Sequence, residues 1–138
     1  AVATFCEIVV MIVAPRWIFR VGRDQLLLVS AIAAALRWIL LSFVAHPLLF
    51  VAAQGLHALS FGLFLPVLVS EVARLLPENM VQSSQGLLVS TVFGIGGGLG
   101  VWLAGLALQF GDAPATWLAM AVLALASALF VVPRRAVG

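Results

Sequence analysis

Apolar runs of membrane-spanning length recur along almost the whole chain, and this feature constrains the fold most. The 138 residues are 64% hydrophobic and 9% charged, with a mean hydropathy of +1.25. About 20 helical residues cross a hydrocarbon core about 30 Å thick, whereas the strands of a membrane barrel are about ten residues long and alternate in polarity. The sequence therefore predicts an all-α membrane protein.

Five transmembrane helices are expected, divided by prolines and short polar stretches. They span roughly residues 1–14, 25–44, 48–75, 86–109 and 113–132. Pro15 is expected to end the first helix, which is then too short to cross the bilayer fully. Because the chain starts at Ala1 rather than Met, we expect it to be a fragment whose beginning is missing.

Two polar stretches predict how the later helices begin. The run at 78–85 is expected to be a loop, with Ser83 or Ser84 as the N-cap of the fourth helix. Asp112 is the expected N-cap of the fifth, and Pro114 is tolerated in its first turn.

The arginines predict the orientation of the helices, because Lys and Arg in short loops stay on the cytoplasmic side. Six of the seven arginines fall next to alternate loops: Arg16, Arg20, Arg23, Arg74, Arg134 and Arg135. The loops at 45–47 and 110–115 contain none. We therefore expect a multi-pass protein of the cell inner (plasma) membrane whose C-terminus is cytoplasmic.

Four polar or ionisable residues lie inside the apolar segments, at overlapping depths. Arg37 lies roughly 18 Å from the cytoplasmic end of its helix and Glu7 roughly 10 Å, while Gln54 and His57 lie roughly 9 and 14 Å from the outer end. A charge at the centre of a span costs about 3 kcal/mol unless it is paired or faces water. These residues are the candidate functional site: Arg37, Gln54 and His57 for substrate binding, Glu7 and His57 for proton coupling.

Two other interpretations of these residues remain. Glu7 and Arg37 can form a purely structural ion pair, with His57 bonded to a neighbouring carbonyl. Ser60 follows His57 by three residues, but no third catalytic residue, nucleophile elbow or oxyanion donor accompanies the pair. The chain is therefore not expected to be an enzyme, and no catalytic residue, cofactor or metal site is predicted.

Glycines recur in the fourth segment at a spacing that favours close packing of helices. Gly94 and Gly98 are four residues apart, as are Gly96 and Gly100. No strand precedes this run and no acidic residue follows at the distance that a dinucleotide site requires. We predict that Gly94, Gly98 and Gly100 pack against another helix.

The order of these features resembles the major facilitator superfamily, and within it the phenylpropionate-permease-like group, which is related to the oligosaccharide:proton symporters. The resemblance covers the whole chain and rests on Glu7, the Arg20-Val-Gly22-Arg23 loop, Arg37-Trp38, Gln54-Gly55-Leu56-His57 with Phe61-Gly62, and the glycine-rich helix. It implies most of the C-terminal six-helix half of a transporter whose N-terminal half is missing.

The resemblance also implies roles for three residues. In related sugar symporters, a glutamate, an arginine and a histidine on successive helices serve substrate binding and proton coupling, and they match Glu7, Arg37 and His57. Those symporters carry a second glutamate one turn after the histidine, where this chain has Ser60 and Phe61. Glu7 is therefore the candidate proton carrier.

The function implied is secondary active transport by alternating access, as a proton-coupled symporter (permease) of a small organic solute. The solute is an aromatic or other carboxylic acid, or a sugar. The alternatives are an uncoupled facilitator and a non-transporting helix-packing module. The expected partners are the substrate, protons, the lipid bilayer and the N-terminal half, and not nucleic acid.

Overall fold

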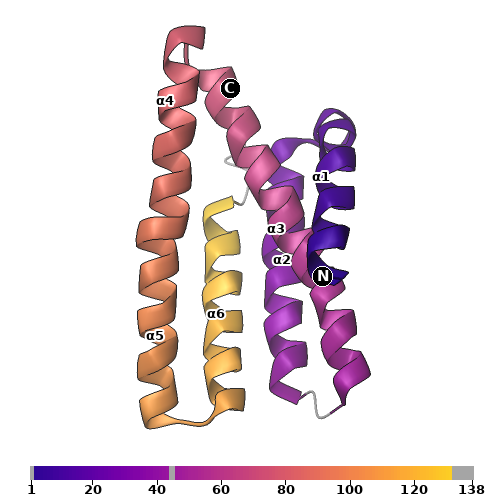
Figure 1. Cartoon of the computed structure of the whole chain (residues 1–138), viewed down its shortest axis with the longest axis vertical. Coiled ribbons are helices and arrows are strands. Elements are labelled where there is room, and N and C mark those ends of the chain that lie inside the picture. The colour runs from indigo at the N-terminus through magenta and orange to yellow at the C-terminus, as the bar shows by residue number, and fades with distance from the viewer. Residues whose placement is uncertain (1, 44–45, 132–138) are drawn as a thin grey trace.

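The computed structural model describes residues 2–43 and 46–131, and this part of the chain is built from helices alone (Figure 1). In order they are α1 (Val2–Val21), α2 (Arg23–Phe43), α3 (Pro47–Leu75), α4 (Glu78–Val89), the π-helical segment η1 (Ser90–Gly96), α5 (Gly97–Phe110) and α6 (Ala113–Val131). Because α4, η1 and α5 follow without a break, they form one rod, called the long helix below. The predicted all-α class is confirmed.

The helices have the length and composition of membrane spans. Among the described residues, α2, α3, the long helix and α6 are each long and apolar enough to cross a bilayer. α1 is 20 residues long but carries Glu7, Arg16 and Arg20. The fold is therefore that of a multi-pass membrane protein.

The first helix does not end at Pro15, so that expectation was wrong. α1 continues to Val21. Proline removes one backbone hydrogen bond, but spanning helices tolerate it where neighbouring groups support the chain. Trp17 and Ile18, beyond the proline, pack against the core and hold the helix together. The chain then turns at Gly22, whose φ of 97° favours glycine.

The polar run at 78–85 is helical, so the predicted loop and the start at residue 86 were wrong. α4 begins at Glu78 with Pro77 as its N-cap, and neither Ser83 nor Ser84 has that role. An acidic residue in the first turn interacts favourably with the helix dipole. The long helix has 33 residues, or roughly 50 Å, so its polar first turns extend beyond a hydrocarbon core.

The remaining boundaries agree closely with the prediction. α3 has Pro47 in its first turn and ends before Pro77. Asp112 caps α6, because its Oδ1 accepts a hydrogen bond from the Ala115 amide at 2.8 Å. Residues 44 and 132, the expected ends of two helices, lie outside the described residues, as do Arg134 and Arg135.

The helices pack in two groups. α3 packs along both α1 and α2, and α2 packs along α6. The core lies where the first three helices meet and consists of Ala14, Leu26, Leu63 and Val67. The long helix stands to one side, meets α3 through α4 and α6 through α5, and buries no residue (Figure 1).

The glycines of the long helix do not make the predicted helix contact within the described residues. A Cβ atom built on Gly94, Gly98 or Gly100 meets no atom within 4 Å. The close approach lies elsewhere: a Cβ on Gly62 of α3 would be 3.0 Å from the Val10 Cβ of α1. Packing of the other three glycines against a helix remains a prediction.

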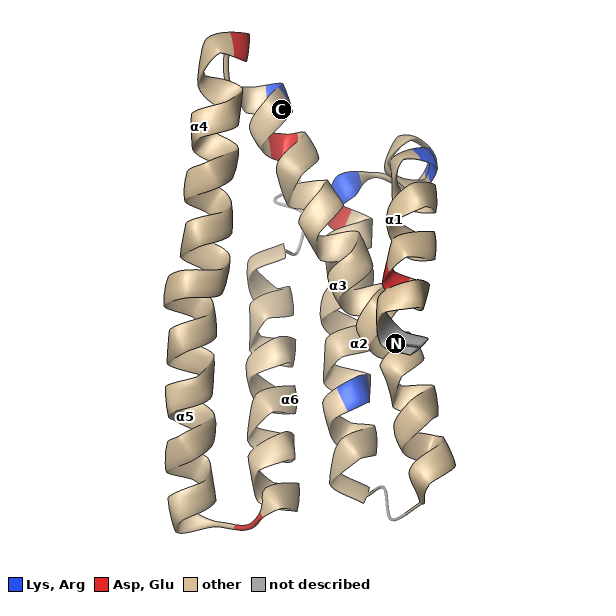
Figure 2. Cartoon of the chain, in the orientation of Figure 1, with Lys and Arg blue, Asp and Glu red and all other residues tan. Residues whose placement is uncertain are grey.

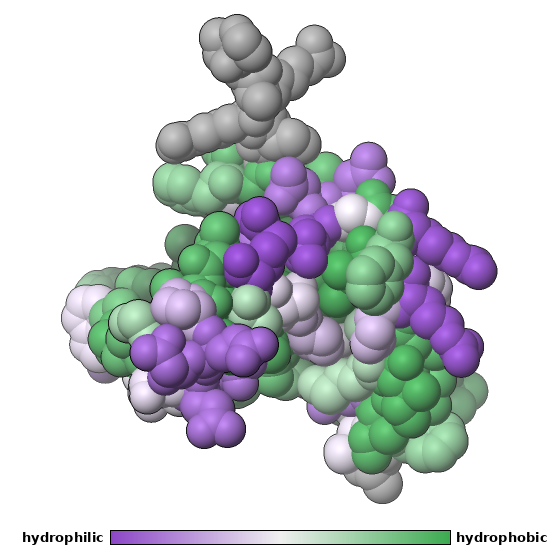
Figure 3. Space-filling model, turned by 90° about the horizontal axis from the view of Figure 1, so that it is seen from above, coloured by the Kyte–Doolittle hydropathy of each residue, from purple (hydrophilic) through white to green (hydrophobic). Residues whose placement is uncertain are grey.

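Charged residues gather at the end of the bundle where α4 begins (Figure 2). Arg23 opens α2 there, Arg74 lies in the last turn of α3 and Glu78 opens α4. Seen from this end, hydrophilic residues lie among apolar ones (Figure 3). The described arginines outside the spans thus share one end, as the orientation rule requires.

Candidate functional site

The structure brings three of the four predicted site residues together. His57 of α3 lies between Glu7 of α1 and Arg37 of α2. Its Nε2 is 2.8 Å from Glu7 Oε1, and its Nδ1 is 2.9 Å from Arg37 Nη1. The fourth, Gln54, does not line the pocket described below, and its side chain makes no hydrogen bond to a described residue.

Close packing of α1 on α3 positions Glu7. Gly62 lies one turn and a half beyond His57, and its missing side chain lets α1 approach. A Cβ there would lie 3.5 Å from the Glu7 carbonyl oxygen, in addition to its contact with Val10. Small residues allow such approaches between membrane helices. The contact therefore sets the distance from Glu7 to His57.

The hydrogen bonds define the tautomer of His57. A guanidinium group only donates and stays charged in proteins, so Arg37 donates to Nδ1. Nδ1 must then carry a free lone pair, and the proton of the neutral ring lies on Nε2. His57 therefore donates from Nε2 to the Glu7 carboxylate and accepts at Nδ1 from Arg37. The three groups form one directed chain with a net charge of zero.

The hydrogen-bonded chain of Arg37, His57 and Glu7 is partly shielded from solvent. The side chains of His57 and Glu7 are 31% and 19% exposed. The Nε atom of Arg37 is buried and lacks a hydrogen-bond partner among the described residues. Leaving such a donor unpaired is costly.

Arg37 also contacts an aromatic ring, which itself stacks on a second ring. Its Cζ lies 4.6 Å from the centre of the Trp38 ring, within the range of a cation–π contact. Trp38 stacks on Trp117 of α6, with centroids 5.2 Å apart and planes 11° from parallel. α6 thus supports the arginine through two rings.

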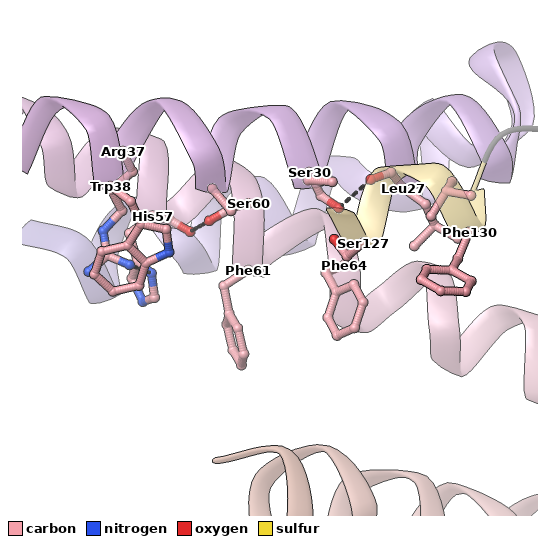
Figure 4. Close-up of a pocket in the computed structure, with 13 residues that line it drawn as sticks. Leu27, Ser30, Arg37, Trp38, His57, Ser60, Phe61, Phe64, Ser127 and Phe130 are labelled. Carbon is pink, nitrogen blue, oxygen red and sulfur yellow. Dashed lines mark hydrogen bonds between the residues drawn. The ribbon is translucent and has the colours of Figure 1, made fainter. Parts of the chain in front are cut away.

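A pocket of about 470 Å³ opens beside the cluster, between α2, α3 and α6 (Figure 4). Its wall includes Arg37, Trp38, His57, Phe61, Phe64 and Phe130, with Ser30, Ser60 and Ser127 among them. A volume of this size suits a small molecule, and such sites are commonly apolar with a few polar groups. Arg37 and His57 lie at one end of the wall, and its other lining residues are apolar apart from the three serines.

The serines of the wall donate their protons to their own helices. Ser30 bonds the Leu27 carbonyl, Ser60 the His57 carbonyl and Ser127 the Ala124 carbonyl. Their hydroxyls can thus accept from a ligand but have no spare proton to donate.

This arrangement does not resemble a Ser–His nucleophile pair. The nitrogens of the His57 ring bond Glu7 and Arg37, and the Ser60 hydroxyl bonds a backbone carbonyl instead. Among the described residues, no group of three or more His, Cys, Asp or Glu side chains could hold a metal ion.

A second ionic cluster lies at the end where α4 begins. Glu71 and Arg74, three residues apart near the end of α3, form an ion pair at 2.8 Å. Arg23 joins it from α2, with its Nε 2.9 Å from Glu71 Oε1 and 3.3 Å from Ser70 Oγ. This cluster ties the start of α2 to the end of α3.

Comparison with known proteins identifies the family. The family model described as MFS_1 like family matches residues 1–119. The chain belongs to the MFS_1-like family of the major facilitator superfamily. Searches of curated proteins and of solved structures found no match. Membership points to a membrane transporter, which is not an enzyme, and such a transporter binds a small substrate within the bilayer.

Several residues around the site had no signal in the sequence. Trp117 and Phe130 lie in spans that are apolar on every side, so their positions do not distinguish them from residues that face lipid. The sequence marks Gly62 only as part of a family motif. Sequence alone does not show which helix approaches it.

Proposed function

We propose that this chain forms part of a secondary active transporter that carries a small organic anion together with a proton. The observation that supports this is the hydrogen-bonded chain of Glu7, His57 and Arg37 beside a pocket of about 470 Å³. Ionisable residues within membrane spans are typical of substrate and proton pathways. Because the chain belongs to a transporter family, a role in transport is the best explanation for these three residues.

The charge balance of the cluster favours coupling. A proton added alone would leave one uncompensated positive charge at membrane depth, and an anion added alone would leave one negative charge. Each such charge costs about 3 kcal/mol on insertion scales. A proton and a monoanion together leave the balance at zero. Binding of one therefore favours binding of the other, which is the thermodynamic requirement of symport.

The hydrogen bonds suggest how the proton acts. A proton on Nδ1 of His57 would remove the acceptor that Arg37 uses, while Nε2 would remain bonded to Glu7. A proton on Glu7 would instead neutralise the anion that balances Arg37. In both cases the guanidinium is left free to bind a carboxylate, whose planar shape it matches.

The pocket wall favours an organic acid with an apolar body over a sugar. A sugar presents many hydroxyls that need donors and acceptors. The serine hydroxyls of the wall already donate to backbone carbonyls, and most other lining residues are apolar. Aromatic acids, the class implied by the resemblance to phenylpropionate permeases, fit a wall that includes Phe61, Phe64 and Phe130. Benzoate and 3-phenylpropionate are therefore the first probes.

We place the protein in the cell inner membrane with its arginine-rich end in the cytoplasm, and we expect an N-terminal half to supply the opposite wall of the pathway. In a Cys6→Ser background, Asp112→Cys should react with an impermeant maleimide added outside intact cells, and Arg20→Cys should react only after lysis. The reverse labelling pattern would show that the arginine-rich end lies outside the cell.

Glu7→Gln tests the coupling. The amide mimics the protonated acid, so exchange of substrate across the membrane should survive while accumulation driven by a pH difference is lost. Labelled benzoate and 3-phenylpropionate would be followed in vesicles containing the full-length protein, by counterflow and by proton-driven uptake. Glu78→Gln, an exposed glutamate outside the cluster, is the matched control.

Three outcomes would contradict parts of the proposal. Accumulation by Glu7→Gln at the wild-type level would show that Glu7 is not the coupling group. Uptake by the wild-type protein that does not depend on the pH difference would indicate an uncoupled facilitator. A wild-type protein that moves neither these acids nor a panel of labelled sugars would favour a non-transporting module.

A further inference from the structure

An aromatic chain connects the long helix to His57. Phe61 lies one turn after His57 on α3 and stacks on the imidazole, with centroids 5.8 Å apart and planes 17° from parallel. Phe93 of η1 then meets Phe61 edge-on, at 5.6 Å and 64°. The residue that links Glu7 to Arg37 is therefore in indirect contact with the π segment.

Side chains alone make this connection. No Cα atoms of η1 and α3 lie within 8 Å of each other, and the backbone of the long helix approaches the described part of the bundle at α4 and α5. Figure 4 shows the Phe61 ring pointing out of the pocket wall, away from α2. Phe93 meets that ring edge-on, although about half of its surface, 49%, stays exposed.

Phe93 lies within the π segment. π-helical turns are rare, occur frequently at functional sites and are places where helices bend. No residue of η1 is buried, so a bend there would break little packing. The contact that such a bend would change first is the edge-on contact with Phe61.

We propose that Phe93 is a positioning residue for the proton site. It supports Phe61 against the imidazole, and Phe61 keeps His57 in the plane that bonds Glu7 and Arg37 together. Movement of the long helix at η1 changes this support and so changes the hydrogen bonds of His57. The inference rests on the proposed function in one respect, namely that the cluster of Glu7, His57 and Arg37 takes part in proton transfer.

Nuclear magnetic resonance of His57 tests the positioning without a substrate. The full-length protein would be labelled with ¹³C and ¹⁵N histidine and placed in lipid nanodiscs, and the His57 signals would be assigned by their loss in His57→Asn. A stacked Phe61 ring shields the imidazole C–H protons. Phe93→Ala should therefore move these signals downfield, in the same direction as Phe61→Ala.

Matched variants separate positioning from general damage. Ile95→Ala removes a neighbouring side chain of η1 that is 63% exposed, and it should leave the signals in place. Phe93→Tyr should keep them near the wild-type position, and Phe93→Leu should shift them because it keeps bulk but lacks a ring edge. If the alanine variant does not fold, the leucine and tyrosine variants decide.

The inference and the proposed function can fail separately. His57 signals that stay at the wild-type position in Phe93→Leu or Phe93→Ala, or that move equally in Ile95→Ala, overturn the positioning role whatever the transport assay shows. A downfield shift in the two Phe93 variants, absent from Phe93→Tyr and Ile95→Ala, supports it. That result would stand even if the wild-type protein showed no proton-driven uptake.

Discussion

Two clusters, each with one glutamate and two basic residues, lie at different depths of the same bundle. At the charged end, Glu71 bonds two arginines whose side chains are 33% and 54% exposed. Water and salt screen such pairs, which typically contribute about 0–1 kcal/mol each. This cluster holds helix ends together and asks for no further partner.

The inner cluster has the same kinds of residue and a different physical role. Glu7 and Arg37 are separated by neutral His57 at membrane depth, where an uncompensated charge costs about 3 kcal/mol. One donor of Arg37 remains buried and unpaired. Depth, rather than composition, therefore turns an ion cluster into a candidate transport site.

The largest effect on transport is expected from Arg37→Ala, which removes the arginine of the inner cluster. Removal of the cation leaves Glu7 unbalanced and takes away the anchor for a substrate anion, so uptake of benzoate per folded molecule should fall roughly 100-fold, the equivalent of about 3 kcal/mol. Arg20→Ala, an exposed arginine of α1, should have little effect. Lower expression with normal turnover per molecule would instead support the purely structural ion pair.

A smaller effect is expected from Gly62→Ala, which tests what holds the inner cluster together. The new Cβ would lie 3.0 Å from Val10 Cβ and Cγ1, so α1 must shift and carry Glu7 away from His57. Overpacking of this kind costs typically about 1–3 kcal/mol. Thermal unfolding followed by tryptophan fluorescence should show a lower Tm, together with weaker proton-driven uptake.

The double variant Gly62→Ala with Val10→Ala should recover part of both properties, because it removes Val10 Cγ1, one of the two Val10 atoms that the new Cβ would meet, while Val10 Cβ stays in place. Gly98→Ala is the control, since its Cβ meets no described atom within 4 Å. A large loss in Gly98→Ala would place a packing partner for the long helix outside the described residues. No rescue by Val10→Ala would show that Val10 Cγ1 contributes nothing to the clash.

The smallest effect is expected at the charged end. Glu71→Gln should change stability by no more than about 2 kcal/mol, because each of its two ion pairs contributes about 0–1 kcal/mol, and raising the salt concentration should shrink the difference from wild type further. Transport should stay within about fivefold of the wild type. A loss of uptake as severe as that of Arg37→Ala would show that the two clusters do not differ in kind.

The spans and their polar residues could be predicted because membrane insertion depends on composition and length. Glu7, Arg37 and His57 were expected at overlapping depths, and they are in contact in the structure. Local rules failed where neighbours intervene. Pro15 stays helical because the residues after it are packed, and the run at 78–85 is helical because Pro77 and Glu78 begin the helix before the serines.

The surroundings of the site could not be predicted, for a reason specific to membranes. Lipid and protein interior are both apolar, so a span has no polar face to indicate which side packs inward. Trp117 and Phe130 therefore carried no signal. The glycine run in the long helix suggested the close contact, whereas within the described residues that contact is at Gly62.

The zero net charge of the Glu7–His57–Arg37 chain bears on the energy source of the cycle. One proton carried with one monoanion transfers no charge from one side of the membrane to the other. For such a cycle the voltage across the membrane does no work, whatever its size. Under the proposed mechanism the acidity difference alone would drive accumulation, and an energised cell at neutral external pH would gain little from this protein.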